Sequence, residues 1–278
     1  MSEEQVISKQ AGDCPRFRKP PVVETVMGLQ FEEIKGLSSL LLGKFHDIIR
    51  SEYPKSEEQM RLDRLVETFP RVPRPQGFKL VTQQRRPIRA WFLSEQADRL
   101  LQLQADRLTF NWRKPSSDAP YPSYSMNSHC FFEALEKLHR FIADHRLGEI
   151  SPEIVEVIYV NHIPRMHGQS FAQMFPHYLS GMTLDHSTGF LPEPEVLSWN
   201  RVYEIPEKRG RLYAEASVAQ NAQDGEDQII VLKMTARVLH SEDSEIEGTF
   251  DIAHEWVVRG FESVTTLSAR RDEWEQQP

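Results

Sequence analysis

The sequence has few of the residues and motifs that mark secreted, membrane and redox proteins. Among its 278 residues only Cys14 and Cys130 are cysteines, and their spacing matches no metal-ligand or redox motif. This argues against a disulfide framework and is typical of a reducing compartment. No apolar run approaches the roughly 20 residues that cross a bilayer. Because the first residues are polar and lack a secretory pattern, we expect a cytoplasmic protein without membrane association.

Nucleotide-binding and hydrolase motifs are also missing. The 13 glycines form neither G-x-G-x-x-G nor G-x-S-x-G. The Gly43-Lys44 pair lacks the upstream glycine and the following serine or threonine of a phosphate-binding loop. The sequence therefore predicts no cofactor.

Positive charge is in deficit, and the charge is unevenly distributed. The chain carries 33 basic and 41 acidic residues, a net charge of −8, which argues against a general nucleic-acid binder. Residues 1–150 hold 23 basic and 20 acidic side chains, whereas residues 151–278 hold 10 and 21. This asymmetry can steer a cationic partner onto the second half or favour a homodimer. The alternative is two solvated surfaces that happen to differ.

Hydrophobic residues make up 39% of the chain, and their spacing alternates between strand and helix periods. The pattern predicts an α+β protein with a flexible N-terminal arm (1–18) and two units (19–150 and 151–278), which can form one compact domain. In the first unit we expect a strand at 22–31, a helix at 37–53, an irregular segment at 55–87 with at most a short helix near 60–68, strands at 88–93, 99–104 and 107–113, and a helix at 128–147 capped by Asn127-Ser128. In the second we expect a strand at 153–163, a helix at 170–179, strands at 199–205, 211–218 and 228–239 with a turn at 224–227, and a helix at 250–268 capped by Thr249.

The two units repeat the same order of elements, which predicts an internal duplication. The strand at 153–163 can be aligned with the strand at 22–31, with Glu156 on Glu24 and Ile163 on Phe31. Antiparallel strands with one apolar face need a cover, and the two long helices can provide it. We therefore expect two curved sheets, or one continuous sheet, gripping two long helices with a cleft between the repeats.

Several polar residues are candidates for ligand binding. Glu24 and Glu156 occupy equivalent positions, where they pair with nearby arginines or face each other across a cleft as an acid and a base. Asn161 lies near the end of a buried strand, so its amide must bond to the backbone or to a ligand. Asp251, His254 and Glu255 share one helical face, which suits a metal or acid–base pair, yet the second histidine of a metal motif is replaced by Val258. The structural alternative places Asp251 at the helix N-terminus and gives His254 a structural hydrogen bond.

Two further sets of residues, the histidines and the basic residues, contain possible binding groups. His162, His167, His177 and His186 are close in sequence, but their spacing matches no metal site, so we predict no metal and interpret them as surface or capping residues. Basic residues interleave with Trp91 and Trp112, a pattern found in single-stranded nucleic-acid binders, although both tryptophans are expected in the core. These nucleic-acid candidates are Arg85, Arg86, Arg89, Arg99, Arg107 and Arg113.

Four segments together resemble a sporadically distributed prokaryotic family of conserved length, about 260–280 residues, with no established biochemical activity. They are Lys19-Pro20-Pro21-Val22-Val23-Glu24 leading into Gly28–Phe31, Phe110–Arg113 with Tyr121–Tyr124, Tyr159–Ile163, and Phe250–Glu255 with Phe261, Thr265-Thr266 and Trp274. The resemblance implies a prokaryotic cytoplasmic protein with the patchy distribution of accessory or defence genes. It carries over no catalytic residue. Its polar signature falls on Glu24, Asn111, Asn161, Asp251 and His254.

From these features we predict a non-enzymatic interaction protein that binds a protein partner through a concave sheet or the inter-repeat cleft. It would act as an accessory or antitoxin-like component of a prokaryotic defence or mobile-element system. One alternative is a small-molecule-binding protein or enzyme in which Glu24, Asn161, Asp251 and His254 converge in the cleft. A second is single-stranded nucleic-acid binding by the basic first meander.

Overall fold

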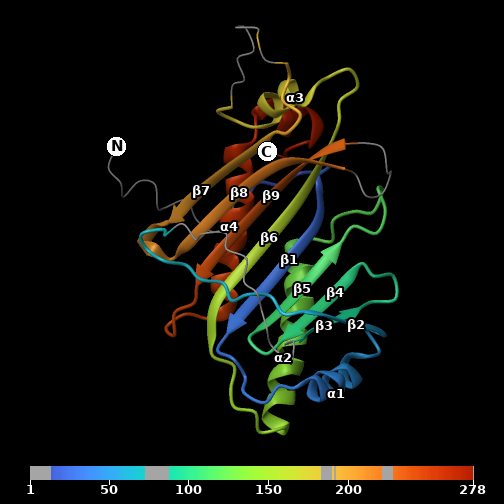
Figure 1. The fold of residues 1–278 in the computed structure, drawn as a ribbon, viewed down its shortest axis with the longest axis vertical. Coiled ribbons are helices and arrows are strands. Elements are labelled where there is room, and N and C mark those ends of the chain that lie inside the picture. Colours follow the sequence, from blue (N-terminus) through green and yellow to red (C-terminus); the bar gives the residue numbers. More distant parts are fainter. Residues whose placement is uncertain (1–13, 73–87, 183–189, 191, 221–227, 278) are drawn as a thin grey trace.

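One nine-stranded antiparallel sheet organises the protein. The computed structural model describes residues 14–72, 88–182, 190, 192–220 and 228–277. The strand order is β2-β3-β4-β5-β1-β6-β9-β8-β7. The helices α2 and α4 run along one face of this sheet (Figure 1). The α+β fold class is therefore confirmed, and the strands form one continuous sheet.

The elements follow the predicted order closely. The strands are β1 (Val22–Phe31), β2 (Lys55–Met60), β3 (Ile88–Leu93), β4 (Arg99–Gln104), β5 (Arg107–Arg113), β6 (Pro152–Pro164), β7 (Ser198–Ile205), β8 (Gly210–Gln220) and β9 (Gln228–Leu239). The helices are α1 (Ser39–Ile49), α2 (Tyr124–Asp144), α3 (Phe171–Tyr178) and α4 (Ile246–Val264), with short turns η2 (Pro206–Lys208) and η3 (Ala269–Glu273). The predicted turn at 224–227, His186, Arg85, Arg86 and residues 1–13 lie outside the described residues.

Alternating side chains give the sheet two different faces. In β5, Leu108, Phe110 and Trp112 are buried in the core beneath α2, because successive side chains of a strand point to opposite faces. Asn111 and Arg113 point to the other face, where their partners are polar. The sheet thus has an apolar face covered by helices and a polar face.

Both long helices begin one turn earlier than predicted. The predicted cap residues, Asn127 and Thr249, are buried inside α2 and α4. The Asn127 amide donates to Thr25 Oγ1 on β1 at 2.9 Å, and Thr249 Oγ1 donates to the Glu245 carbonyl at 3.3 Å. Cap-type residues also serve as hydrogen-bonding groups within helices, and sequence alone does not separate the two uses. In α2 the cap is Ser123, whose hydroxyl accepts from Met126 N.

The segment predicted to be irregular from residue 55 begins with a strand, and residues 60–68 form no helix. Residues 55–60 form the edge strand β2, and residues 61–72, which we call the strap, cross the polar face of the sheet toward β8 (Figure 1). Side chains of the sheet replace helical hydrogen bonds: Gln104 Oε1 accepts from Leu62 N, and Gln30 Oε1 accepts from Leu65 N. The strap therefore stays extended because the sheet satisfies its backbone.

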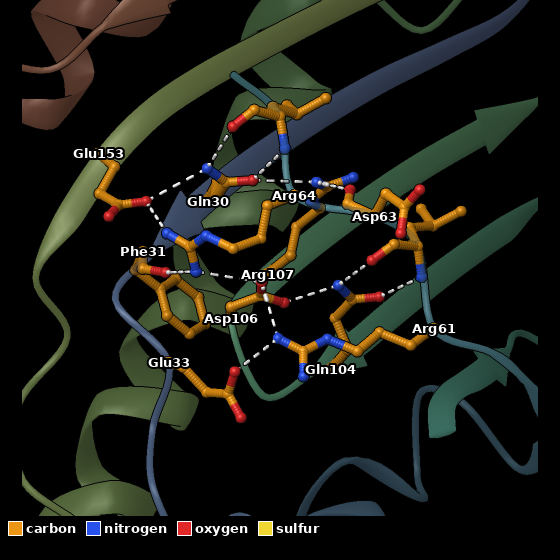
Figure 2. A network of polar contacts seen from close by, with 12 residues as sticks. Gln30, Phe31, Glu33, Arg61, Asp63, Arg64, Gln104, Asp106, Arg107 and Glu153 are labelled. Carbon is orange, nitrogen blue, oxygen red and sulfur yellow. Dashed lines mark hydrogen bonds and ion pairs between the residues drawn. The ribbon is translucent and has the colours of Figure 1, made fainter. Parts of the chain in front are cut away.

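The strap connects the first half of the chain to the second through ion pairs, of which the Glu67–Arg211 pair is buried. Figure 2 shows Arg64 pairing with Asp106 at the β4–β5 turn and with Glu153 on β6. Farther along, the Glu67 carboxylate binds Arg211 of β8 at 2.5 Å. These contacts hold β1, β6 and β8 under one covering segment.

The part of the predicted N-terminal arm that the structure describes is attached to the C-terminal segment. The Gln277 amide donates to the Arg16 carbonyl at 2.8 Å, and the Arg18 amide donates to Glu275 O at 3.2 Å. The Phe17 ring packs edge-on against Phe261 of α4, with centroids 5.5 Å apart. Residues 14–18 are therefore fixed against α4. Among the helices described, none has both the length and the apolar character needed to cross a membrane.

Candidate functional site

A cavity of about 530 Å³ lies where the N-terminal segment crosses α4 and the seam between β1 and β6. Its walls come from four parts of the chain: residues 14–22, the loop and first turn at 121–125, β6, and one face of α4. We call it the tyrosine cavity. It is lined by Cys14, Pro15, Arg16, Phe17, Pro20, Pro21, Val22, Tyr121, Ser123, Tyr124, Ser125, Tyr159, Asn161, His254, Val257, Val258, Phe261 and Gln277.

Two tyrosine hydroxyls meet at the wall of this cavity. Tyr121 precedes α2 between two prolines, and Tyr159 points from β6 to the helix-covered face. Their hydroxyl oxygens are 2.7 Å apart, and the Tyr121 ring packs edge-on against Trp112. Burial raises the pKa of Tyr121 to about 12 and raises the pKa of Tyr159 well above its ordinary value. Both phenols are therefore protonated at neutral pH.

A second aromatic pair stands on the helix side of the cavity. The His254 ring of α4 stacks on Tyr124 with centroids 3.8 Å apart and planes inclined by 7°. The Tyr124 hydroxyl donates to Asp251 Oδ1 at 3.0 Å, one helical turn before His254. Within the described residues, neither ring nitrogen of His254 has a hydrogen-bond partner. Asp251 thus fixes Tyr124, Tyr124 fixes the imidazole plane, and the imidazole nitrogens remain available.

A β-bulge shapes the floor of the cavity. The β1–β6 register shifts between Val22, which pairs with Asn161, and Glu24, which pairs with Val160. The buried Asn161 amide donates to the Leu232 carbonyl of β9 at 3.0 Å, as expected of a polar side chain near the end of a buried strand. Nearby, Ser123 has a φ of +91°, an unusual backbone angle for a serine. Bulges and strained residues often accompany binding sites because they redirect side chains.

The cavity walls are electrically neutral at pH 7 apart from Arg16, which is exposed. Burial lowers the pKa of His254 to about 4, although the nearby Asp251 charge opposes this shift. Burial and the Glu255 charge raise the pKa of the Cys14 thiol. The site therefore presents protonated phenols, a neutral imidazole, a protonated thiol and an amide. Such a surface favours aromatic compounds over metal ions.

The depressed pKa of His254 predicts a pH-dependent stability. As the pH falls from 6.5 to 4, the unfolded chain binds a proton at His254 that the folded chain does not, so the free energy of unfolding decreases. We expect this contribution to be about 2 kcal/mol. His254→Gln should lose that part of the pH dependence in urea unfolding at pH 4.5 and 7. If the free energy of unfolding changes equally between pH 4.5 and 7 in both proteins, the result contradicts a neutral, buried His254 imidazole.

Three of the predicted ligand-binding residues lie on the opposite, polar face of the sheet. Glu24 Oε1 accepts hydrogen bonds from Asn111 at 2.7 Å and from Arg113 at 3.1 Å. Glu156 Oε1 accepts one from Arg237 at 2.7 Å. In the β1–β6 register Glu156 pairs with Gly28, not with Glu24, so the two carboxylates do not face each other. Of the two interpretations, the contacts support pairing with nearby arginines and not an acid–base pair across a cleft, because each glutamate has an arginine partner on a neighbouring strand.

The arginines proposed for nucleic acid do not form one surface among the described residues. The Arg89 and Arg113 guanidinium groups lie 5.4 and 5.5 Å from the centroid of the Trp91 ring on the polar face, so Trp91 is not in the core that contains Trp112. Arg99 points to the helix-covered face beside Tyr53, and Arg107 is buried under the strap. Strand alternation and the strap separate side chains that are close in sequence.

The residues that converge in the tyrosine cavity are only partly those that sequence reasoning selected. Asn161 and His254 line it, and Asp251 holds its Tyr124 wall. Tyr121, Tyr124, Tyr159 and Val258 are not among the predicted site residues, although all three tyrosines lie in segments that carry the family resemblance. No group of three or more potential metal ligands occurs in the part of the chain that the structure describes. Neither a protein-family model nor any curated protein matches the chain, so the family resemblance stays a prediction.

Proposed function

We propose that this protein binds a small, flat aromatic compound in the tyrosine cavity. The observation that carries the proposal is a neutral, aromatic cavity of about 530 Å³ whose walls converge from four separate parts of the chain. Ligand pockets of this kind occupy roughly 300–1,000 Å³ and combine apolar walls with a few placed polar groups. A fused two-ring compound matches these dimensions.

The polar groups of the cavity suit the edge of such a ligand. Tyr121 and Tyr159 share one hydrogen bond between two hydroxyls, so the pair retains a second proton to donate. The neutral His254 imidazole offers one donor and one acceptor, and its orientation is fixed by stacking on Tyr124. Tyr124 and Asp251 are positioning residues in this proposal, since they hold the imidazole in place.

The position of the cavity agrees with an internal duplication, which we also propose. The strand order β3-β4-β5-β1 in one half has its counterpart in β7-β8-β9-β6 in the other, and α2 and α4 follow as the last long element of each half. The cavity lies at the seam between β1 and β6, where the two units meet. This favours the small-molecule alternative over the protein-partner hypothesis, which stays a prediction together with the homodimer.

A neutral fluorescent dye, 1-anilinonaphthalene, tests the proposal. We expect the protein to bind it at one saturable site, with an increase in dye fluorescence. Val258→Trp should weaken binding at least 30-fold, because Val258 follows His254 by one turn of α4 and lines the cavity. Ser125→Trp, at an exposed lining position, should act in the same direction without endangering the core.

The matched control is Leu40→Trp, which introduces the same side chain on α1 at a position that is 81% exposed and lines neither described cavity. This variant should bind the dye as the unmodified protein does. Absence of dye binding, or equal affinity in the Val258→Trp, Ser125→Trp and Leu40→Trp proteins, would overturn the proposal.

A further inference from the structure

A second, more open hollow of about 1280 Å³ adjoins the tyrosine cavity. The two share Phe17, Tyr121 and residues 20–22 as lining. The segment 17–22 and Tyr121 therefore form a common wall. A ligand that fills the tyrosine cavity therefore contacts a wall that also lines the second hollow.

The second hollow is lined by several cationic groups, whereas Arg16 is the one charged residue among those lining the first. Lys114 follows β5, and Arg165 lies in the loop after β6. Arg18 and Lys19 stand at its edge, where both pair with Glu275. Two acidic residues also line it: Glu273 accepts hydrogen bonds from His177 and Tyr178, and Asp118 accepts one from Ser117. The lining thus carries more positive than negative charge on a chain whose net charge is −8.

Two of these cations have no carboxylate partner within the described residues. Lys114 is partly buried, and no described carboxylate lies within ion-pair distance of its ammonium group. Arg165 donates from Nε to the Gln169 carbonyl at 3.3 Å and lies over the Phe171 ring, which fixes the guanidinium without neutralising it. Arg165 is exposed and Lys114 is partly buried, so both charges are accessible to an anion that enters the hollow.

We infer that this hollow binds an anionic group of the same ligand, so that the ligand class is an aromatic compound carrying a phosphate, sulfonate or carboxylate. The inference rests on the proposed function. The aromatic body occupies the tyrosine cavity, and Lys114 and Arg165 bind the anion across the shared wall. Arginine and lysine are the usual recognition groups for phosphate and related anions. The excess of negative charge elsewhere on the chain gives these two residues the selective role, because anions are repelled from most of the surface.

The experiment compares two dyes with the same aromatic body: neutral 1-anilinonaphthalene and 8-anilinonaphthalene-1-sulfonate. At low salt the sulfonate should bind at least tenfold more tightly. Raising the ionic strength to 0.5 M should reduce this advantage, because ions screen the attraction. The double variant Lys114→Gln/Arg165→Gln should lose most of the advantage and keep its affinity for the neutral dye. The control Lys35→Gln/Lys44→Gln removes the same charge from exposed positions outside both cavities and should keep the advantage.

The outcomes separate the two claims. If the neutral dye binds but the sulfonate gains nothing, or if Lys114→Gln/Arg165→Gln retains the gain, the anion site is refuted and the aromatic cavity stands. If neither dye binds, the proposed function fails, and this inference fails with it. An equal loss of the sulfonate advantage in both double variants would also overturn the inference, because net charge alone would explain it.

Discussion

Replacing Glu67 with alanine is expected to lower the free energy of unfolding by about 3–5 kcal/mol. The Glu67 side chain is 1% exposed and binds Arg211, which is 4% exposed. It also accepts a hydrogen bond from the Tyr213 hydroxyl at 2.6 Å and lies 3.6 Å from Arg237. Removing the carboxylate leaves a buried guanidinium without its counter-charge. Urea unfolding followed by circular dichroism measures the loss.

Two companion variants test the reason for this loss. Glu58→Ala on β2 removes an exposed carboxylate and should change stability by less than about 0.5 kcal/mol. Glu67→Ala combined with Arg211→Met removes both charges and should recover a large part of the lost stability. If the single Glu67→Ala variant is as stable as Glu58→Ala, the strap does not hold the sheet through this ion pair.

Gly210→Ala should destabilise the protein by about 3 kcal/mol. Gly210 is the first residue of β8, and an added Cβ would lie 1.9 Å from the Arg237 carbonyl oxygen of β9. Because the obstacle is backbone, the two strands must separate at the position where Arg237 reaches Glu67 and Glu156. The melting temperature and the urea midpoint report this effect.

Gly43→Ala in α1 is the matched control for that substitution. An added Cβ at Gly43 meets nothing within 4 Å, and alanine is the better helix former. The control should therefore stabilise the protein by up to about 1 kcal/mol. Equal effects of the two substitutions would contradict the close approach of β8 and β9.

The α+β class and most strand bounds could be predicted because the core depends on local apolar spacing. The alternation of Leu108, Phe110 and Trp112 fixed β5, and the run at 22–31 fixed β1. The strap could not be predicted, since its backbone bonds to Gln30 and Gln104, which are far away in sequence. The helix starts were misplaced for a related reason: Asn127 and Thr249 have cap chemistry but serve tertiary contacts.

The candidate site was less predictable than the fold. His254 and Asp251 were selected because they share a helical face, a local property that sequence reveals. Tyr121 and Tyr159 meet only through the packing of α2 against the sheet, so no local spacing marks them. Glu24 and Glu156 were selected for equivalent positions in two repeats, but antiparallel register places Glu156 opposite Gly28.

The tyrosine cavity and the second hollow together define one class of ligand. Protonated phenols and a neutral imidazole line the first, and Lys114 and Arg165 lie beside the second. A ligand with an aromatic body and an anionic group satisfies both at once. Such a ligand also stabilises the fold by mass action, since the cavity that binds it exists only in the folded chain.

The most direct measurement is a crystal structure of the protein with 8-anilinonaphthalene-1-sulfonate bound. Our account predicts the naphthalene rings in the tyrosine cavity, in contact with Val258 and the stacked Tyr124–His254 pair, and the sulfonate within hydrogen-bond distance of Lys114 or Arg165. Density for the dye only elsewhere, or a cavity that the dye leaves empty at saturating concentration, would contradict the account.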